Sequence, residues 1–207
     1  MHLPSAAGNL ATRARRRAFA RWPFATLARP AAASRYHHAM SDDVRLEPLS
    51  LSHLDHVMSW VNDHEVLQYF ANRQSDITRA DEERYLASLL ASPNDRAFSV
   101  FSGERYLGQV SINQIYWPAK NGRLFVVVKK SEQGNGFGPA AIRAVTKLAW
   151  EQLGLHKLWL IVRKDNRRAQ AMYLQLGFDF EGVLLDEYFV GGRFHDMVRM
   201  SLRRPAR

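Results

Sequence analysis

The sequence predicts one α/β domain of the α+β type, with a mixed, mostly antiparallel sheet flanked by helices on both faces. Its segments alternate in the order strand, two helices, three strands, helix, strand, helix and two strands. A strand–helix–strand crossover is predicted near residues 124–162, which requires two parallel strands. With 207 residues, 46% of them apolar, the chain can bury one good core.

The first half of the domain is expected to hold one strand, two helices and a hairpin. Residues 44–49 alternate apolar and polar side chains, and Ser52–Asp55 resembles a capping box that opens a helix ending at Asn62–Asp63. A second helix should begin near Thr78, with Asp81 three residues on, and stop at Ser92–Pro93–Asn94. The predicted antiparallel hairpin comprises residues 97–101 and 106–115, joined by the turn 102–105.

The second half is expected to hold four more strands and two helices. A strand over residues 123–129 follows the turn signal Asn121–Gly122. Pro139 suits a first helical residue, and a buried stripe should follow it. The stripe consists of Ile142, Val145, Leu148, Ala149 and Leu153. The remaining elements are a strand over 158–162, a helix over 167–176 ending at Gly177, and strands over 178–184 and 194–202.

The basic charge of the chain is concentrated in its first 41 residues. This segment has seven arginines and no Asp, Glu or Lys, so the net charge of +9 falls to +2 in residues 42–207. We therefore exclude residues 1–41 from the fold and assign 42–207 to the domain. The tail resembles an organellar transit peptide, but it could also be a solvated arm for nucleic acid or anionic membrane, or translation could begin at Met40.

Composition excludes several kinds of site. The chain has no cysteine, so it forms no disulfide, thiolate metal site or cysteine nucleophile. No apolar run approaches the roughly 20 residues needed to cross a bilayer, and we expect a soluble protein. The eight histidines show no metal-ligand spacing, so no metal is predicted.

A glycine-rich segment between a strand and a helix is the strongest chemical signal. It reads Gln133-Gly134-Asn135-Gly136-Phe137-Gly138. Glycines let the backbone approach a ligand closely, and the N–H groups at the start of the next helix attract an anion. The spacing matches neither a Walker loop nor a dinucleotide fingerprint. Taken alone, the segment could be only a tight connection, but it is typical of phosphate binding.

Two motifs in order resemble those of the GNAT superfamily of N-acetyltransferases. Gln133-x-x-Gly136-x-Gly138 is similar to the superfamily's pyrophosphate signature. Asp165-Asn166-Arg167-Arg168-Ala169, leading to Tyr173 and Leu176-Gly177-Phe178, is similar to its second signature. The segments 181–184, 188–189 and 192–196 resemble the branch of ribosomal-protein N-terminal, polyamine and nucleotide-amino-sugar acetyltransferases. The resemblance covers about residues 44–202.

The resemblance implies acetyl-CoA as co-substrate and assigns residues to it. The strand carrying Val126 and Val128 would splay from its neighbour and pair with the pantetheine arm. The glycine-rich segment would hold the pyrophosphate, Asn166 would hydrogen-bond the pantetheine, and Ala169 would also contact the cofactor. Tyr173 would protonate the departing thiolate. Asn166 and Tyr173 lie seven apart on the same helix face, although Asn166 could also be an N-cap and Tyr173 a core residue.

The acceptor side and the general base are less defined. The resemblance places the acceptor pocket at the aromatic stretch between the first two helices. Its candidate residues are Trp60, Asn62, Glu65, Tyr69 and Phe70, whose alternative is simple packing. Residues 123–130 contain no Asp or Glu, so the base is a water or a loop carboxylate such as Asp63, Glu65 or Glu187. The few carboxylates in this stretch argue mildly against a polycationic acceptor.

The predicted activity is acetyl transfer to a primary amine by direct attack, the amine being a protein N-terminus, an amino sugar or a small amine. The alternative is a non-catalytic acyl-CoA-binding or sensor module whose basic arm contacts nucleic acid. We expect no membrane partner, and nucleic acid only through the tail. The expected location is the cytoplasm, or an organellar matrix if the tail is a transit peptide. The oligomeric state is open, a homodimer included.

Overall fold

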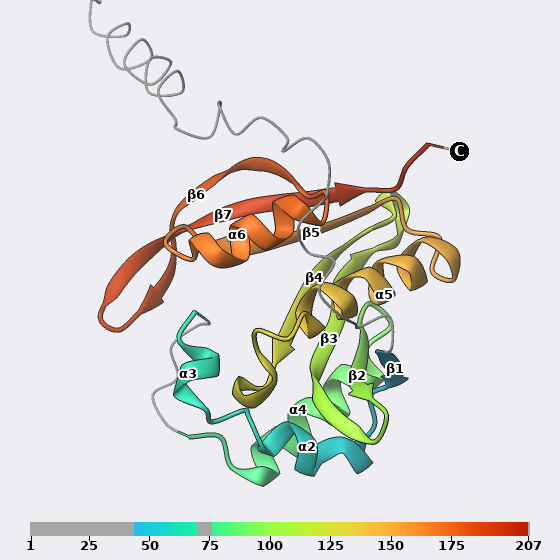
Figure 1. The fold of residues 1–207 in the computed structure, drawn as a ribbon, viewed down its shortest axis with the longest axis vertical. Coiled ribbons are helices and arrows are strands. Elements are labelled where there is room, and N and C mark those ends of the chain that lie inside the picture. Colours follow the sequence, from blue (N-terminus) through green and yellow to red (C-terminus); the bar gives the residue numbers. More distant parts are fainter. Residues whose placement is uncertain (1–43, 70–75, 207) are drawn as a thin grey trace, which may run out of the picture. The chain divides into compact units, whose positions relative to one another are not determined.

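The computed structural model describes residues 44–69 and 76–206 (Figure 1). The basic tail and Phe70 lie outside the described residues. The strands are β1 (Arg45–Pro48), β2 (Arg96–Ser102), β3 (Arg105–Tyr116), β4 (Asn121–Val128), β5 (Lys157–Arg163), β6 (Asp179–Val190) and β7 (Arg193–Arg203). The helices are α2 (Leu54–Met58), α3 (His64–Leu67), α4 (Arg79–Ala91), α5 (Phe137–Glu151) and α6 (Arg167–Gln175), with short 3-10 turns η3 (Leu51–His53), η4 (Trp117–Ala119) and η5 (Lys130–Glu132).

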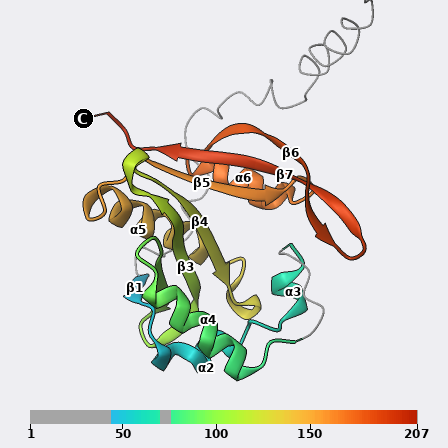
Figure 2. The ribbon, with the colours of Figure 1, turned by 180° about the vertical axis from the view of Figure 1, so that it is seen from behind.

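The strands form one sheet in the order β1-β2-β3-β4-β5-β7-β6, which can be followed in Figures 1 and 2. Every neighbouring pair is antiparallel except β4 and β5, which are parallel and joined through α5. The predicted mixed sheet and its crossover are therefore confirmed. The crossover matters for function because it places the glycine-rich segment at the carboxyl end of β4, immediately before α5.

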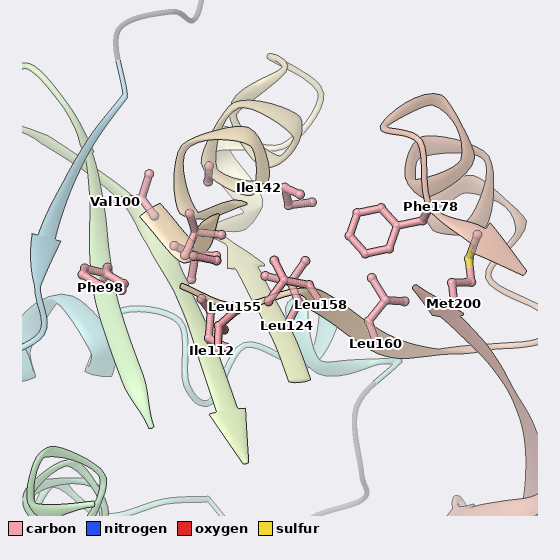
Figure 3. Packing of buried hydrophobic residues seen from close by; sticks show 14 of the residues in the cluster. Phe98, Val100, Ile112, Leu124, Ile142, Leu155, Leu158, Leu160, Phe178 and Met200 are labelled. Atoms are coloured by element: carbon pink, nitrogen blue, oxygen red, sulfur yellow. The ribbon is translucent and has the colours of Figure 1, made fainter. Parts of the chain in front are cut away.

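Two apolar clusters lie on opposite faces of the sheet, as the alternation of side chains along each strand requires. One cluster joins α5 to the strands, and Figure 3 shows Ile142 of α5 and Phe178 packed with Leu158 and Leu160 of β5. The other joins α2 and α4 to the first strands, with Val57 and Leu86 fully buried. Helices on both faces are thus confirmed, and each layer fixes one half of the site.

Several local predictions are corrected. No side chain caps η3 or α2, and the Ser52 hydroxyl instead bonds to that of Ser50, so the capping box is wrong. Helix α2 ends at Met58 rather than at Asn62, since residues 59–62 form turns. Helix α5 begins at Phe137, two residues before Pro139, because Gly136 takes the left-handed conformation that lets the helix start there.

Other local predictions hold. The Thr78 side chain accepts a hydrogen bond from the N–H of Asp81 and caps α4, as the spacing of these residues predicts. The final hairpin is longer than expected, since β6 runs to Val190. Within the described part of the chain, no helix is long and apolar enough to span a membrane.

Candidate active site

The parallel strands β4 and β5 separate along their length. They are paired only at their beginnings, from Asn121 opposite Lys157 to Arg123 opposite Trp159. Beyond this point β4 continues to Val128 and β5 to Arg163 without pairing to each other, and Figure 1 shows them diverging. Val126 and Val128 are half-buried on the free part of β4. The free strand edge offers N–H and C=O groups to an extended ligand.

The glycine-rich segment forms an open cradle at the wide end of this separation. Gly134 and Gly136 have φ angles of +87° and +82°, and a Cβ on either residue would meet nothing within 4 Å. The Gln133 amide donates to the carbonyl of Val128 at 3.0 Å and ties the loop to the end of β4. Both glycines thus adopt the left-handed conformation that disfavours other residues and leave open space where a side chain would lie.

The start of α5 is electrostatically suited to an anion. Its N-cap is Gly136, no side chain caps it, and no acidic residue lies in its first turn. The N–H groups of Phe137 and Gly138 precede any helical acceptor and can point toward a ligand. The Phe137 ring is buried and lies under the guanidinium of Arg105, so this residue offers the ligand only its main chain. The side chain of Asn135 folds back toward the Glu132 carbonyl.

Helix α6 reaches the same place from the other side of the separation. A Cβ on Gly138 would lie 3.7 Å from a methyl of Val128 and 3.9 Å from the sulfur of Met172. The end of β4, the start of α5 and the middle of α6 therefore meet in van der Waals contact distance. The neighbours of Met172, Ala169 and Tyr173, pack against the same apolar cluster. Two sequence motifs more than 25 residues apart thus converge.

Tyr173 packs against the core and Asn166 caps a helix, which are the alternative roles considered for them. Each side chain also keeps a polar group that bonds to no described protein residue. Tyr173 packs against Phe178, with ring centroids 5.6 Å apart, but in the described part of the chain its hydroxyl makes no hydrogen bond to protein. Burial raises the pKa of Tyr173 to about 12, so the hydroxyl keeps its proton at neutral pH. Asn166 caps α6 by accepting from the N–H of Ala169 at 3.1 Å. Its side-chain N–H groups remain available.

Two of the predicted acceptor residues are structural. Trp60 is 6% exposed, and its indole N–H donates to the hydroxyl of Tyr106 at 3.0 Å within the cluster under α2 and α4. Asn62 donates to the carbonyl of Ile77 and accepts from its N–H, at 3.0 and 2.9 Å. Both side chains therefore make structural contacts with the chain around them. Their role as acceptor residues stays a prediction.

Glu65 and Tyr69 are exposed and lie on a segment, residues 64–69, that is tied to both separated strands. Glu65 forms an ion pair of 2.6 Å with Lys130, just after β4. The guanidinium of Arg163, the last residue of β5, lies 5.3 Å from the ring centre of Tyr69. We call residues 64–69 the bridging segment. It includes the short helix α3 and joins the far ends of β4 and β5 through side chains.

Two of the three candidate bases, Asp63 and Glu65, already bind other groups of the protein. Asp63 is the N-cap of α3 and accepts from the N–H groups of Glu65 and Val66. Glu65 is paired with Lys130. Glu187 is exposed on β6.

In the described ranges, 44–69 and 76–206, no group of three or more His, Asp or Glu side chains is arranged to hold a metal ion.

Sequence reasoning missed Arg163. It is 8% exposed although arginine is rarely buried, and its guanidinium binds both carboxylate oxygens of Asp165. These hydrogen bonds hold the pKa of Asp165 below its ordinary value. The signal available in the sequence was a single charge closing the apolar run 158–162. That signal gave no partner, because Gln68 and Tyr69 lie more than 90 residues away.

A cavity of about 550 Å³ lies beside Asp165, where the residues after β5 and the start of β7 bound it. Its lining comprises Lys164, Asp165, Arg167, Phe194, His195 and Asp196. Lys164 and Asp196 form an ion pair of 2.8 Å across it. Part of the predicted branch motif, residues 194–196, therefore lines a cavity next to the start of α6.

Comparisons with known proteins agree with this geometry. The family model described as an acetyltransferase (GNAT) domain matches residues 43–179. Spermidine N(1)-acetyltransferase from Escherichia coli is 26% identical over 159 residues, which cover 77% of this chain and 85% of that protein. The enzyme of the same name from Vibrio cholerae is 24% identical over 163 residues, covering 79% and 94%.

The fold also has solved counterparts. A crystal structure of spermidine N-acetyltransferase from Vibrio cholerae in complex with CoA and spermine superimposes with a TM-score of 0.74 at 23% identity. The superposition covers 79% of this chain and 96% of that one. The two proteins therefore share a fold.

Proposed function

The chain belongs to the GNAT family of acetyl-CoA-dependent N-acetyltransferases, and from this premise we propose how its residues divide the transfer of an acetyl group to a primary amine. The observation that carries the proposal is the convergence of three elements on one place: the free edge of β4, the open cradle before α5, and the Tyr173 helix.

Acetyl-CoA is held mainly by the main chain. The N–H groups of residues 134–138 bind the pyrophosphate, and Gln133 keeps the cradle closed onto the end of β4. The strand edge at Val126 and Val128 pairs with the pantetheine arm, and the side-chain N–H of Asn166 bonds to it from α6. Ala169 supports the cofactor by packing at the base of this helix. Acetyl-CoA supplies the activated acetyl group.

Tyr173 is the general acid. The amine's lone pair forms the new C–N bond while the C–S bond breaks, and the Tyr173 hydroxyl gives its proton to the departing thiolate. A main-chain N–H near Val128 polarises the acetyl carbonyl. The hydroxyl is suited to this task because it is protonated at neutral pH and makes no hydrogen bond to the described protein residues.

The proton of the incoming ammonium leaves through water. Asp63 is occupied as a helix cap, and Glu65 is paired with Lys130. Neither carboxylate is free to serve as the base without first losing its partner. A water between the bridging segment and solvent is then the simplest acceptor of this proton.

The acceptor amine meets the thioester beside the bridging segment, where Glu65 and Tyr69 are exposed. The relatives named above are spermidine acetyltransferases, which makes spermidine the first amine to test. Asp63, Glu65 and Asp165 are engaged by other groups, which favours an amine with fewer positive charges, such as a peptide N-terminus or an amino sugar. Phe70, the fifth predicted acceptor residue, lies outside the described residues.

The experiment is thiol release from acetyl-CoA with a panel of amines: spermidine, tetrapeptides with free N-termini, an amino sugar phosphate and a simple alkylamine. We expect at least one amine to stimulate release and to appear as its acetylated product by mass spectrometry. If calorimetry shows acetyl-CoA binding and no amine stimulates release, the protein is a sensor or binding module and the enzymatic proposal fails.

Two broader proposals accompany this one. We propose a cytoplasmic location, to be checked by fractionating cells that produce the full chain, and a homodimer, to be checked by light scattering. Contact of the tail with nucleic acid is tested by comparing binding at low and moderate salt with and without residues 1–39.

A further inference from the structure

Arg163 occupies a buried position that the reaction itself does not explain. It ends β5, where its backbone lies opposite Met197 of β7. Its Nε donates to Asp165 at 3.0 Å, and a terminal nitrogen donates to the second carboxylate oxygen. A buried guanidinium is costly unless it is paired and hydrogen-bonded, so this fork accounts for its charge.

The remaining terminal nitrogen of Arg163 reaches the bridging segment. It donates to the carbonyl of Gln68 at 3.0 Å, and the same guanidinium lies 5.3 Å from the ring centre of Tyr69. One side chain therefore fixes both the backbone and the aromatic ring at the end of the bridging segment. Tyr69 is 38% exposed, so the ring also offers a free surface toward solvent.

The main chain of Arg163 holds the helix that carries Tyr173. Its carbonyl accepts from the side-chain amide of Gln170 at 2.9 Å and from the N–H of Asn166, also at 2.9 Å. Gln170 is 4% exposed and lies on α6 three residues before Tyr173, on the same side of the helix. Gln170 also donates to the carbonyl of Lys164 at 3.0 Å. The beginning of α6 is thus anchored at the residue that grips Tyr69.

We propose that Arg163 is a positioning residue that holds the acceptor wall, Gln68 and Tyr69, at a fixed distance from the Tyr173 helix. The inference rests on the proposed function, because it assigns the wall to the amine. Misplacing a reacting partner by about 1 Å can cost up to 100-fold in rate, so a single rigid connection between the two sides has kinetic value.

Only an arginine can make these contacts together. The guanidinium is planar and presents donors in several fixed directions, whereas a lysine ammonium is a point charge that would serve Asp165 or Gln68 but not both in this geometry. The second tie of the bridging segment, Glu65 with Lys130, is exposed on both sides and contributes little rigidity by comparison. The contacts of Arg163 therefore contribute more to the rigidity of the bridging segment than the ion pair of Glu65 with Lys130.

The test compares Arg163→Met with Arg163→Lys and with a control, Arg203→Met. Arg203 pairs with Asp179 at 3.2 Å on an exposed part of the last hairpin and contacts neither separated strand end. Hydrogen exchange of the Leu67 amide, which donates to the Asp63 carbonyl at 2.9 Å one residue before Gln68, is measured first, on the full chain without amine. We expect exchange to accelerate at least tenfold in Arg163→Met, less in Arg163→Lys, and not in Arg203→Met.

Kinetics provide the second readout, using the best amine of the panel above. We expect KM for the amine to rise about tenfold in Arg163→Met, with the Kd of acetyl-CoA within twofold of wild type, and partial rescue in Arg163→Lys. If KM for the amine and the Kd of acetyl-CoA rose by the same factor, Arg163 would have a general structural role, and the proposal would be overturned. Unchanged exchange at Leu67 would overturn it as well.

The exchange experiment separates this inference from the proposed function. If wild type accepts no amine, the enzymatic proposal fails, while the exchange rates still decide whether Arg163 holds the bridging segment. If Arg163→Met does not fold, Arg163→Lys replaces it, because it keeps a positive charge beside Asp165 and loses the fork that also reaches Gln68. Faster exchange at Leu67 in that variant supports the connection, and wild-type exchange refutes it.

Discussion

The cradle, residues 133–138, and the bridging segment, residues 64–69, lie at the same end of the sheet but are built by opposite means. The cradle presents main-chain N–H groups, left-handed glycines and no acidic side chain in the first turn of α5. The bridging segment is held by side chains, through Lys130 with Glu65 and Arg163 with Gln68 and Tyr69.

This difference matches the ligand that we propose for each region. A pyrophosphate is the same anion in every reaction, and a fixed set of backbone donors suits it. Acceptor amines vary in shape and charge, and variable side chains on a connecting segment can follow that variation. The cradle therefore has a local signature, whereas the bridging segment depends on partners brought from distant strands.

Tyr173→Phe should have the largest effect, because we propose Tyr173 as the general acid of the reaction. We expect kcat to fall by about 100-fold or more, the usual contribution of a general acid, with little change in the Kd of acetyl-CoA. Single-turnover thiol release and calorimetry would measure the two quantities. Loss of cofactor affinity equal to the loss of kcat would assign Tyr173 to packing.

The pH profile gives an independent check on Tyr173. Its pKa is raised to about 12 by burial, and a phenol is neutral below its pKa, so the proton donor is intact throughout the neutral range. We therefore expect wild-type kcat to show no decline between pH 7 and 9. A decline in that range that disappears in Tyr173→Phe would contradict the raised pKa.

Gly136→Ala should weaken the binding of acetyl-CoA at the cradle and leave the bridging segment unchanged. The φ angle of +82° disfavours an L side chain, and the added methyl would enter the space left for the anion. We expect the Kd of acetyl-CoA to rise about tenfold and stability to fall by roughly 1 kcal/mol. Gly154→Ala is the matched control, since its φ is +64° and its Cβ position is also open, but it lies in the loop after α5.

The comparison of these two glycine variants separates strain from ligand contact. Both should lose similar stability in thermal unfolding, because both place alanine in the left-handed region. Only Gly136→Ala should weaken acetyl-CoA. If Gly154→Ala weakened it as much, the effect would come from strain, and the cradle would lose its role.

Glu65→Gln should have the smallest effect and act on the bridging segment. The pair with Lys130 is exposed, so its loss should change stability by less than about 1 kcal/mol. We expect KM for the amine to change about twofold to threefold at low salt and not at 0.5 M salt, where exposed charges are screened. A salt-independent change above tenfold would instead show that Glu65 touches the amine or serves as its base.

The sequence alone predicted the sheet class and the order of the elements apart from the short helix α3. These predictions depend on neighbouring residues, such as alternating side chains for strands and Thr78 three residues before Asp81 for a helix start. The separation of β4 and β5 also followed once the resemblance was stated, and the strand pairing confirmed it.

Only the tertiary structure decided how the acceptor side is built. The partners of Trp60 and Asn62, which are Tyr106 and Ile77, do not follow from any local pattern. The contacts of Arg163 with Gln68 and Tyr69 join residues more than 90 positions apart, so they do not follow from one either. A local pattern can specify backbone conformation, but whether a polar side chain is free or engaged depends on residues that only the fold brings within about 4 Å.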